Sequence, residues 1–194
     1  MDSKTKQYID SLTVESVPWH RMITAYGTAK NYPELFTALE NARDKEEWEK
    51  VLRALSDFEH QSTMLPPAPF ALVFLVRHFE RLLEAKSETA ARLLDIFMYY
   101  ALVCADAETY LDKVRLERLS DMLLEENLLP DGITDEQLDE YFEAPEMMYE
   151  KLEYSCYFYS EKVLSLIPEM LDKYEEFKEE GRKLKEIVKA FAAG

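Results

Sequence analysis

Glycine, proline, cysteine and histidine are all scarce in this chain of 194 residues, with 4, 8, 2 and 3 copies respectively. Few glycines and prolines leave little room for the many tight turns of an all-β protein, whereas strong helix formers such as Leu, Glu, Lys and Ala dominate. We therefore predict an all-α fold. The two cysteines, Cys104 and Cys156, are too few and too far apart for a disulfide framework, which fits a reducing cytoplasm.

Long apolar runs are also missing. The most apolar stretches, LPPAPFALVFLV and IFMYYALVCA, are too short to span a bilayer. The first residues, MDSKTKQYIDSL, lack the apolar run and the cleavage site of a secretory signal. The sequence therefore predicts neither a membrane segment nor export by that route, and we expect a cytoplasmic protein.

Basic residues are absent from one long stretch of the chain. Between Arg118 and Lys151 there are eleven Asp or Glu residues and no Lys or Arg. Residues 106–180 hold 7 basic and 23 acidic groups, a net charge of −16, whereas residues 1–105 hold 12 and 15, and residues 181–194 hold 4 and 1. Nucleic acids and anionic membranes are bound through Lys and Arg. We therefore expect no direct binding to either.

Motifs for metals, cofactors and nucleophilic catalysis are missing as well. One helical turn beyond His78 stand Arg81 and Leu82, which cannot bind zinc, and with three histidines in all, local spacing predicts no His/Cys zinc cluster. The segment NLLPDGITDEQL is not a calcium loop, because Leu129 and Leu138 stand where acids belong. No phosphate-binding loop, dinucleotide fingerprint or serine nucleophile motif is present. The sequence predicts no metal or cofactor, and an enzyme would need an unrecognised arrangement of residues.

Apolar residues recur at helical spacing through most of the chain. Cap and breaker residues place predicted helices at 17–27, 31–42, 44–61, 66–86, 87–106, 107–129, 134–145, 145–181 and 182–194. Pro168 predicts a kink or a break near Ile167 in the longest of these. The short connections favour an antiparallel helical bundle, although an irregular α-solenoid gives the same pattern. With no flexible linker, we predict a single domain over residues 1–194.

The first third of the chain shows an ordered set of residues: a Trp, an Ala-Tyr-Gly, a Pro-started helix, then His-Gln-x-Thr before a Phe-Leu helix. The set consists of Trp19, Ala25, Tyr26, Gly27, Ala29, Pro33, Leu39, His60, Gln61, Thr63, Phe74 and Leu75. In this order, residues 17 to about 75 resemble a family of bacterial helical-repeat (HEAT-like) proteins. Thr24, Ser62 and Val73 stand where that family usually has His, Gly and Pro. The resemblance implies stacked antiparallel helices at this end and no established activity.

The first candidate site is a pocket formed by Trp19, Tyr26, His60 and Gln61. An imidazole and an amide next to two aromatic rings would suit a hydrolase or a small-ligand-binding protein. The alternative interpretation is structural: His60 would cap the carbonyls at the end of its helix, and Trp19 with Tyr26 would form a packing corner.

The second candidate site is an acidic, Tyr-rich helical face. The segment TDEQLDEYFEAPE, residues 134–146, holds six carboxylates and two aromatic rings without one basic residue. Like charges on one helix cost stability that a basic partner would offset, and aromatic residues are favoured at interfaces. The expected contact residues are Asp135, Glu136, Asp139, Glu140, Tyr141, Glu143, Glu146, Tyr149 and Glu150. The alternative is a solvated face that keeps the protein soluble.

The function that best fits this pattern is non-enzymatic binding of a basic protein. In its sharpest form, the chain is an immunity-type inhibitor that covers the positive cleft of a nucleic-acid-acting toxin. A scaffold within a larger complex is a further alternative, and it would show an exposed apolar face and a stable oligomer.

Overall fold

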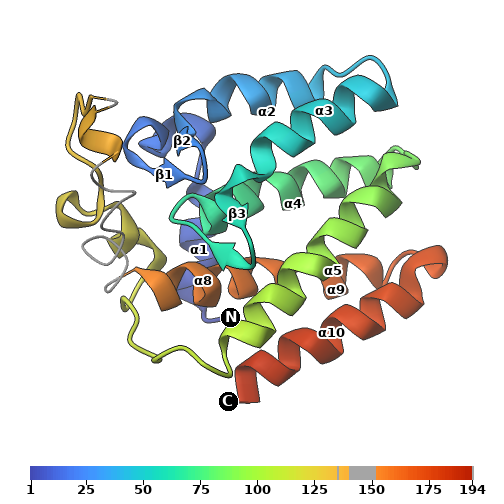
Figure 1. Cartoon of the computed structure of the whole chain (residues 1–194). Helices are drawn as coiled ribbons and strands as arrows, with labels where there is room; N and C mark the ends of the chain where they lie inside the picture. The colour runs from blue at the N-terminus through green and yellow to red at the C-terminus, as the bar shows by residue number, and fades with distance from the viewer. Residues whose placement is uncertain (135, 140–151, 194) are drawn as a thin grey trace.

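A computed structural model describes residues 1–134, 136–139 and 152–193 of the chain (Figure 1). Helices make up 69% of the structure and strands 5%, which confirms the predicted all-α class. Figure 1 shows α2 beside α3 and α4 beside α5, with α8, α9 and α10 below them, an arrangement that fits a helical bundle or a short solenoid. The helices are α1 (Ser3–Ser11), α2 (Tyr32–Glu40), α3 (Lys45–Leu55), α4 (Ala68–Glu84), α5 (Thr89–Ala107), α8 (Glu153–Leu164), α9 (Ile167–Leu171) and α10 (Lys178–Ala193).

Short 3-10 turns and two small hairpins connect these helices. The hairpins pair β1 (Ile23–Thr24) with β2 (Gly27–Thr28), and β3 (Glu59–His60) with β4 (Thr63–Met64), both antiparallel. The 3-10 turns are η1 (Val14–Ser16), η2 (Trp19–Arg21), η3 (Ala29–Asn31), η4 (Ser56–Phe58), η5 (Leu119–Leu123), η6 (Glu125–Asn127) and η7 (Glu175–Phe177).

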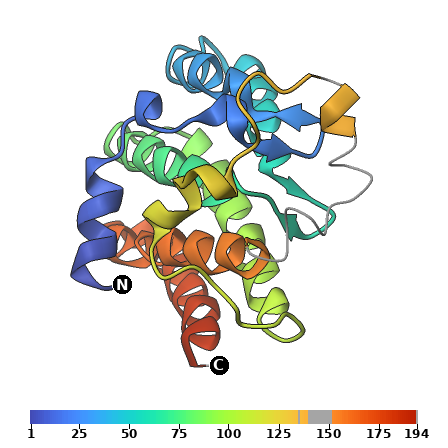
Figure 2. The same ribbon diagram turned by 90° about the vertical axis from the view of Figure 1, so that its left-hand side faces the viewer.

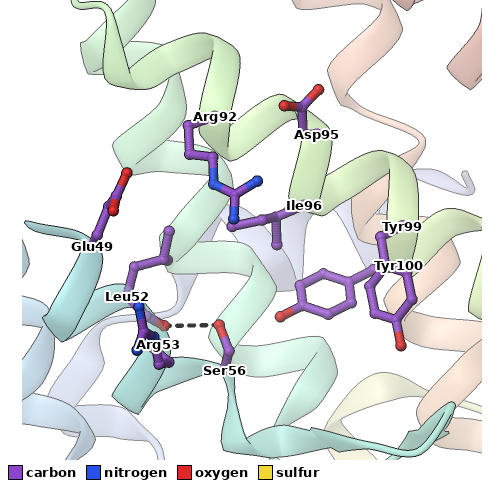
Figure 3. Close-up of a pocket in the computed structure, with 9 residues that line it drawn as sticks. All are labelled: Glu49, Leu52, Arg53, Ser56, Arg92, Asp95, Ile96, Tyr99 and Tyr100. Carbon is purple, nitrogen blue, oxygen red and sulfur yellow. Dashed lines mark hydrogen bonds between the residues drawn. The ribbon is translucent and has the colours of Figure 1, made fainter.

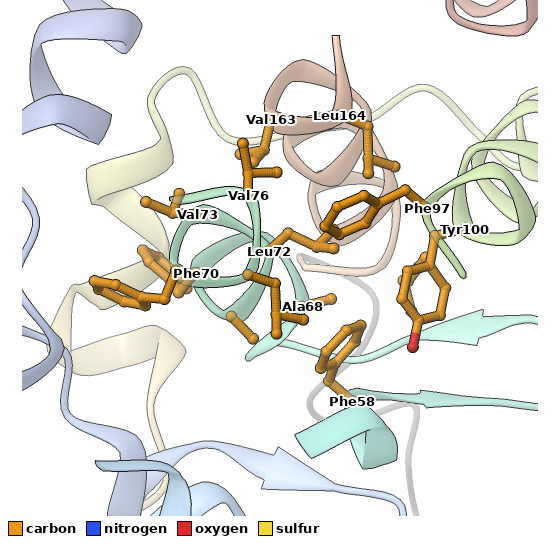
Figure 4. Close-up of a cluster of buried hydrophobic side chains, with 14 of the residues drawn as sticks. Phe58, Ala68, Phe70, Leu72, Val73, Val76, Phe97, Tyr100, Val163 and Leu164 are labelled. Atoms are coloured by element: carbon orange, nitrogen blue, oxygen red, sulfur yellow. The ribbon is translucent and has the colours of Figure 1, made fainter. Parts of the chain in front are cut away.

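The core is built around α4, whose apolar first half is buried on all sides. Every residue from Ala68 to Val76 is buried, because α5 and α8 both pack along this helix. Figure 4 shows Leu72 of α4 close to Phe97 of α5, and Val76 close to Val163 of α8. The run from Phe70 to Val76 is unbroken and apolar, so this half of the helix has no polar side chain to turn toward solvent.

Cap and breaker residues act as predicted at two helix boundaries. Asp44 caps α3, since its carboxylate accepts a hydrogen bond from the amide of Glu47 at 2.9 Å. Of the kink or break predicted near Ile167, the structure shows the break: α8 ends at Leu164 and α9 begins at Ile167. Proline has no amide hydrogen to donate to the preceding turn, so a continuous helix would lose a hydrogen bond there.

The helix predicted over 107–129 is wrong. The helix α5 ends at Ala107, and only short 3-10 turns follow before residue 128. The backbone of Leu116 bonds to α8 instead: its amide donates to Ser155 Oγ at 2.9 Å, and its carbonyl accepts from the Tyr159 hydroxyl at 2.9 Å. These side chains satisfy an extended backbone, so the segment does not need helical hydrogen bonds.

The helix predicted over 17–27 and the last turn of the one predicted over 44–61 are also wrong, because both regions form hairpins. Gly27 does not cap a helix; it begins β2 with φ +147°. In the second hairpin, Gln61 and Ser62 both have left-handed backbone conformations, with φ of +50° and +65°. Two consecutive left-handed residues match the twist of a two-residue hairpin turn.

Gly181 was predicted to end a helix, but it lies inside α10. A Cβ added at this glycine would come within 3.2 Å of Leu171 Cβ, so the missing side chain lets α10 pack closely on α9.

We expect Gly181→Ile to lower the free energy of unfolding by about 1–2 kcal/mol through overpacking, measured by urea denaturation. Lys185→Ile, at an exposed position of the same helix, is the control, and equal stability of the two variants would contradict the close approach.

Candidate functional site

Two hairpin tips meet on one side of the molecule. Tyr26 lies in the turn between β1 and β2, and His60 ends β3. The Tyr26 hydroxyl lies 3.5 Å from His60 Nδ1, and the two rings meet edge-on with centroids 5.6 Å apart. Figure 2 shows both hairpins projecting toward the same side. Two residues separated by 34 positions therefore form one contact.

Hydrogen bonds fix these tips to the helical body. The amide of Ala25 donates to the carbonyl of Asp57 at 3.0 Å, which ties the first hairpin to the turn before the second. The Asp57 carboxylate accepts from the Tyr32 hydroxyl at 2.5 Å, and burial together with this carboxylate raises the pKa of Tyr32 well above its usual range. The hydroxyl of Tyr157 in α8 donates to the carbonyl of Ser62 at 3.0 Å. Hydrogen bonds to other segments of the protein thus hold both tips in place.

Three exposed tyrosines lie at the tips or beside them. Tyr26, Tyr99 and Tyr110 are 78%, 43% and 59% exposed. The Tyr99 hydroxyl, from α5, donates to a Glu59 carboxylate oxygen at 3.0 Å. Tyr110, just beyond α5, neighbours Tyr157, whose pKa is raised first by burial and further by Tyr110. We call the surface formed by Tyr26, His60, Gln61, Tyr99 and Tyr110 the hairpin face.

A polar hollow of about 610 Å³ adjoins the hairpin face at the first hairpin. Its walls come from β1, β2, the turn that holds Asp57, and residues 132–133 and 138–139. Leu138 packs against Ile23 of β1 and Leu129 in a small separate cluster. The hollow is lined by His20, Thr24, Tyr26, Gly27, Thr28, Lys30, Asn31, Asp57, Gly132, Ile133, Leu138 and Asp139.

A groove between α3 and α5, of about 360 Å³, adjoins the other end of the hairpin face (Figure 3). Tyr99 is shared by the groove and the hairpin face, because it lines the groove and its hydroxyl donates to Glu59 of β3. The charged side chains of the groove include both signs, from Arg53 on α3 and from Arg92 and Asp95 on α5. The full lining is Glu49, Leu52, Arg53, Ser56, Arg92, Asp95, Ile96, Tyr99 and Tyr100.

Two residues of the predicted acidic face are described, and one of them, Asp139, lies beside the first hairpin. Glu136 and Asp139 occupy a short helical turn and are exposed, and Asp139 lines the hollow with Tyr26. A capping box precedes this turn: the Gln137 amide donates to Thr134 Oγ1 at 3.3 Å, and the Thr134 amide donates to Gln137 Oε1 at 3.1 Å. The remaining predicted contact residues lie outside the described part of the chain: Asp135, Glu140, Tyr141, Glu143, Glu146, Tyr149 and Glu150.

Part of the negative charge in region 106–180 is neutralised within the protein. Both oxygens of the Glu125 carboxylate accept from the Arg21 guanidinium, at 2.6 and 2.8 Å. Ion pairs also join Glu108 to Lys113 and Asp121 to Arg118. Several exposed acids of this region have no ion-pair partner within the described residues, among them Asp106, Asp112, Glu117, Glu126, Glu136 and Asp139. The region therefore keeps a negative surface after its internal pairs are formed.

The four residues of the predicted pocket do not share one environment. Trp19 is only 2% exposed and packs against Tyr32, Phe36 and Phe74, with its Nε1 donating to the Val14 carbonyl at 2.7 Å. Tyr26 and His60 are exposed and touch each other, as described above. Gln61 is exposed in the turn of the second hairpin. The structure thus brings together two of the four and places Trp19 in the core.

Two of the exposed tyrosines were missed in the sequence. Tyr99 fell within a predicted apolar helix and Tyr110 on the apolar face of a predicted one, where an aromatic residue is normally core. The break in helical structure after Ala107 is what exposes Tyr110. For Tyr99, the available signal was its position one residue before the buried Tyr100, since two adjacent residues of a helix point in different directions.

No family model, no curated protein and no solved structure matches this chain. The resemblance of residues 17–75 to HEAT-like proteins therefore stays a prediction. Within the described residues, no cluster of three or more His, Cys, Asp or Glu side chains is arranged to hold a metal ion. In the same part of the chain, no helix combines the length and apolarity needed to cross a membrane.

Proposed function

We propose that this chain is a protein-binding module that docks a basic partner on the hairpin face and the acidic segment beside it. The observation that supports this most directly is the placement of Tyr26, Tyr99 and Tyr110. These three exposed rings come from different segments and surround two touching hairpin tips. Large exposed aromatic side chains are enriched at the energetic centres of protein interfaces.

The anchoring of the tips adds to this proposal. Ala25, Asp57 and Ser62 are each held by hydrogen bonds to other parts of the fold. A surface that is already ordered loses less conformational entropy when it binds than a mobile loop does. The hairpin face is therefore suited to contact a partner without rearrangement.

Charge supplies the expected chemistry of the partner. The net charge of the chain is −16, and Asp139 lines the hollow with Tyr26. Glu136 is exposed in the same short helical turn, and neither acid has an ion-pair partner in the described residues. A negative surface attracts a basic protein over long range and speeds its association. The groove between α3 and α5 carries both signs of charge, so it would help to set the orientation of the partner.

The narrower form of the proposal is an immunity-type inhibitor. Enzymes that act on nucleic acids have basic clefts, because they must bind phosphate. An acidic, aromatic surface that covers such a cleft would exclude the substrate. A purified partner that cleaves nucleic acid and is blocked by one equivalent of this chain would support that form.

The test uses two variants with equal changes in charge. Glu136→Lys/Asp139→Lys alters the acidic segment, and Glu80→Lys/Glu84→Lys alters exposed acids on α4. A basic protein captured from the source cells by the wild-type chain should bind the first variant at least about tenfold more weakly, a loss of about 1.4 kcal/mol, and the second variant almost as well as the wild type. Affinity and association rate are measured by surface plasmon resonance, from low to physiological salt.

Two outcomes would contradict docking of a basic partner at this surface. One is equal binding of the partner by both charge-reversed variants. The other is an association rate that does not fall as the ionic strength rises. If the partner is basic but does not act on nucleic acid, only the inhibitor form fails. Tyr26→Ala should also weaken binding if the hairpin face is part of the interface.

A further inference from the structure

The polar hollow beside the first hairpin has a carboxylate in its wall that is only half satisfied. Asp57 lines this hollow and is half-buried. Its Oδ1 accepts a hydrogen bond from the hydroxyl of Tyr32, whereas its Oδ2 has no hydrogen-bond or ion-pair partner within the described residues. Both oxygens of a carboxylate are strong acceptors, so much of the bonding capacity of this group is unused.

The unused oxygen of Asp57 is open to a group that enters from solution. In the described part of the chain, the side-chain atoms that are both unpaired and closed to water are His78 Nδ1, Ser160 Oγ and Glu161 Oε2. Asp57 Oδ2 is unpaired but does not belong to this set, so water reaches it. A hydrogen-bond donor that occupies the hollow can therefore replace that water.

The fold holds Asp57 in a fixed position. Its carbonyl accepts from the amide of Ala25 at 3.0 Å, and its carboxylate accepts from Tyr32 at 2.5 Å. Tyr32 is itself only 2% exposed and packs on the buried ring of Trp19, with centroids 5.2 Å apart. A carboxylate that is already immobile loses little conformational entropy when it binds a cation.

The remaining lining residues add negative charge and an aromatic ring. Asp139 is exposed and lines the hollow, as does the exposed ring of Tyr26. Among the described lining residues, Lys30 is the one lysine or arginine, and it forms no ion pair there with either aspartate. His20 also lines the hollow, and its Nε2 lies 3.4 Å from a carboxylate oxygen of Asp131. The aspartates therefore outnumber the lysine in this wall.

We propose that this hollow takes an arginine side chain of the basic partner, whose guanidinium donates to Asp57 Oδ2 and stacks on the ring of Tyr26. A guanidinium is planar and has five donors, so it bonds a carboxylate and stacks on an aromatic ring at the same time, which the compact ammonium of lysine does less well. The volume of about 610 Å³ leaves room for the whole side chain. This inference rests on the proposed function, because it names the group that the partner inserts.

The probe is Nα-acetyl-L-argininamide, and Nα-acetyl-L-citrullinamide is the control of nearly the same shape without the charge. Backbone amide ¹H–¹⁵N signals of the full-length protein are followed during a titration at pH 7 and low salt. We expect the arginine compound to shift the signals of Gly27 and Thr28 saturably and to leave that of Ile96, in the groove between α3 and α5, unchanged. The citrulline compound should shift none of them, and Nα-acetyl-L-lysinamide should bind more weakly than the arginine compound.

Four variants test which residues hold the arginine compound. Asp57→Asn removes the charge but keeps an oxygen that accepts from Tyr32, and it should weaken binding at least about tenfold. Asp95→Asn, the same change in the groove between α3 and α5, is the matched control and should have no effect. Tyr26→Leu should weaken binding about two- to fivefold by removing the ring. Lys30→Met should strengthen it about two- to fivefold by removing the like charge.

The inference is overturned if the arginine compound leaves Gly27 and Thr28 unchanged, or if the citrulline or lysine compound binds equally well. It is also overturned if Asp57→Asn binds the arginine compound like the wild type. Should Asp57→Asn not fold, Tyr26→Leu and Lys30→Met decide the matter, and unchanged binding by both overturns the inference.

The same variant separates this inference from the proposed function. Asp57→Asn should weaken the captured basic partner as well, and an unchanged affinity would overturn the arginine contact while the docking surface stands. The docking surface itself is tested by Glu136→Lys/Asp139→Lys, which leaves Asp57 in place. If that variant binds the partner normally, the proposed function fails, and the titration with the arginine compound still shows whether the hollow takes an arginine side chain.

Discussion

Replacing Phe97 with alanine is expected to lower the free energy of unfolding by about 3–5 kcal/mol, the usual range for deleting a buried phenyl ring. Phe97 is completely buried in α5 and meets the ring of Phe79 edge-on, with centroids 5.5 Å apart. It also lies beside Leu72 at the centre of the core shown in Figure 4. The neighbouring helices cannot close the space left behind, so lost contacts add to the lost burial. Urea denaturation followed by circular dichroism measures the change.

Leu102 provides the matched control for this substitution. It lies further along the same helix, α5, and is 54% exposed. Leu102→Ala should change the free energy of unfolding by less than about 0.5 kcal/mol. If the two variants unfolded at the same urea concentration, the assignment of α5 as a core helix with Phe97 inward would be wrong.

The long helices could be predicted because their apolar periodicity, caps and breakers agree. Helix α4 carries an unbroken apolar run, and Asp44 and Pro168 mark boundaries that the structure reproduces within a few residues. In these segments the local sequence preference and the tertiary packing point to the same structure. The all-α class follows from them.

The two hairpins could not be predicted, because neither shows the usual sequence signal. Each strand is two residues long, too short to show an alternating pattern. The turn at Gln61 and Ser62 uses two left-handed residues where Asn-Gly or Asp-Gly is typical. Hydrogen bonds from other elements, such as the one from Tyr157 to the Ser62 carbonyl, hold this turn. The residue that stabilises this turn, Tyr157, is therefore distant from it in the sequence.

The segment after α5 was also predicted wrongly from its sequence pattern, because it has the spacing of a helix but does not form one. Its apolar spacing is helical, yet Tyr110 and Val114 are 59% and 69% exposed, whereas Leu119 and Met122 are buried. The hydrogen bond that the Leu116 amide donates to Ser155 Oγ and the extended path of the backbone determine which of these residues pack. Periodicity cannot show that a backbone has partners on another helix.

The candidate site was predictable only in part, for a related reason. Tyr26 and His60 were singled out by motif, and the structure places them in contact. Trp19 belongs to the same motif but supports the fold from the core. The tyrosines that complete the hairpin face are next to one another only after folding, so no spacing in the sequence links them.

Acidification is expected to weaken this protein through His78, and the sign follows from the two protonation states. In the unfolded chain the imidazole titrates near 6.5, whereas burial and, next, the charge of Arg81 lower its pKa to about 4 in the folded state. Between these values the unfolded chain binds a proton that the folded protein does not. The contribution of His78 to stability is therefore complete above pH 6.5 and is lost as the pH falls toward 4. At 1.36 kcal/mol per pH unit, the loss reaches about 2–3 kcal/mol by pH 4.5.

His78→Phe isolates this effect, because the variant lacks the ring that titrates and keeps the other ionisable groups. The difference in unfolding free energy between wild type and His78→Phe should shrink by about 2–3 kcal/mol from pH 7.5 to pH 4.5, measured by urea denaturation across the range. Phe97→Ala keeps His78, so its difference from wild type should stay constant with pH. A constant difference for His78→Phe as well would mean that the His78 ring accepts a proton as readily in the folded protein as in the unfolded chain. The hydrogen bond from Trp48 to Nε2 would then not hold, because a protonated Nε2 cannot accept it.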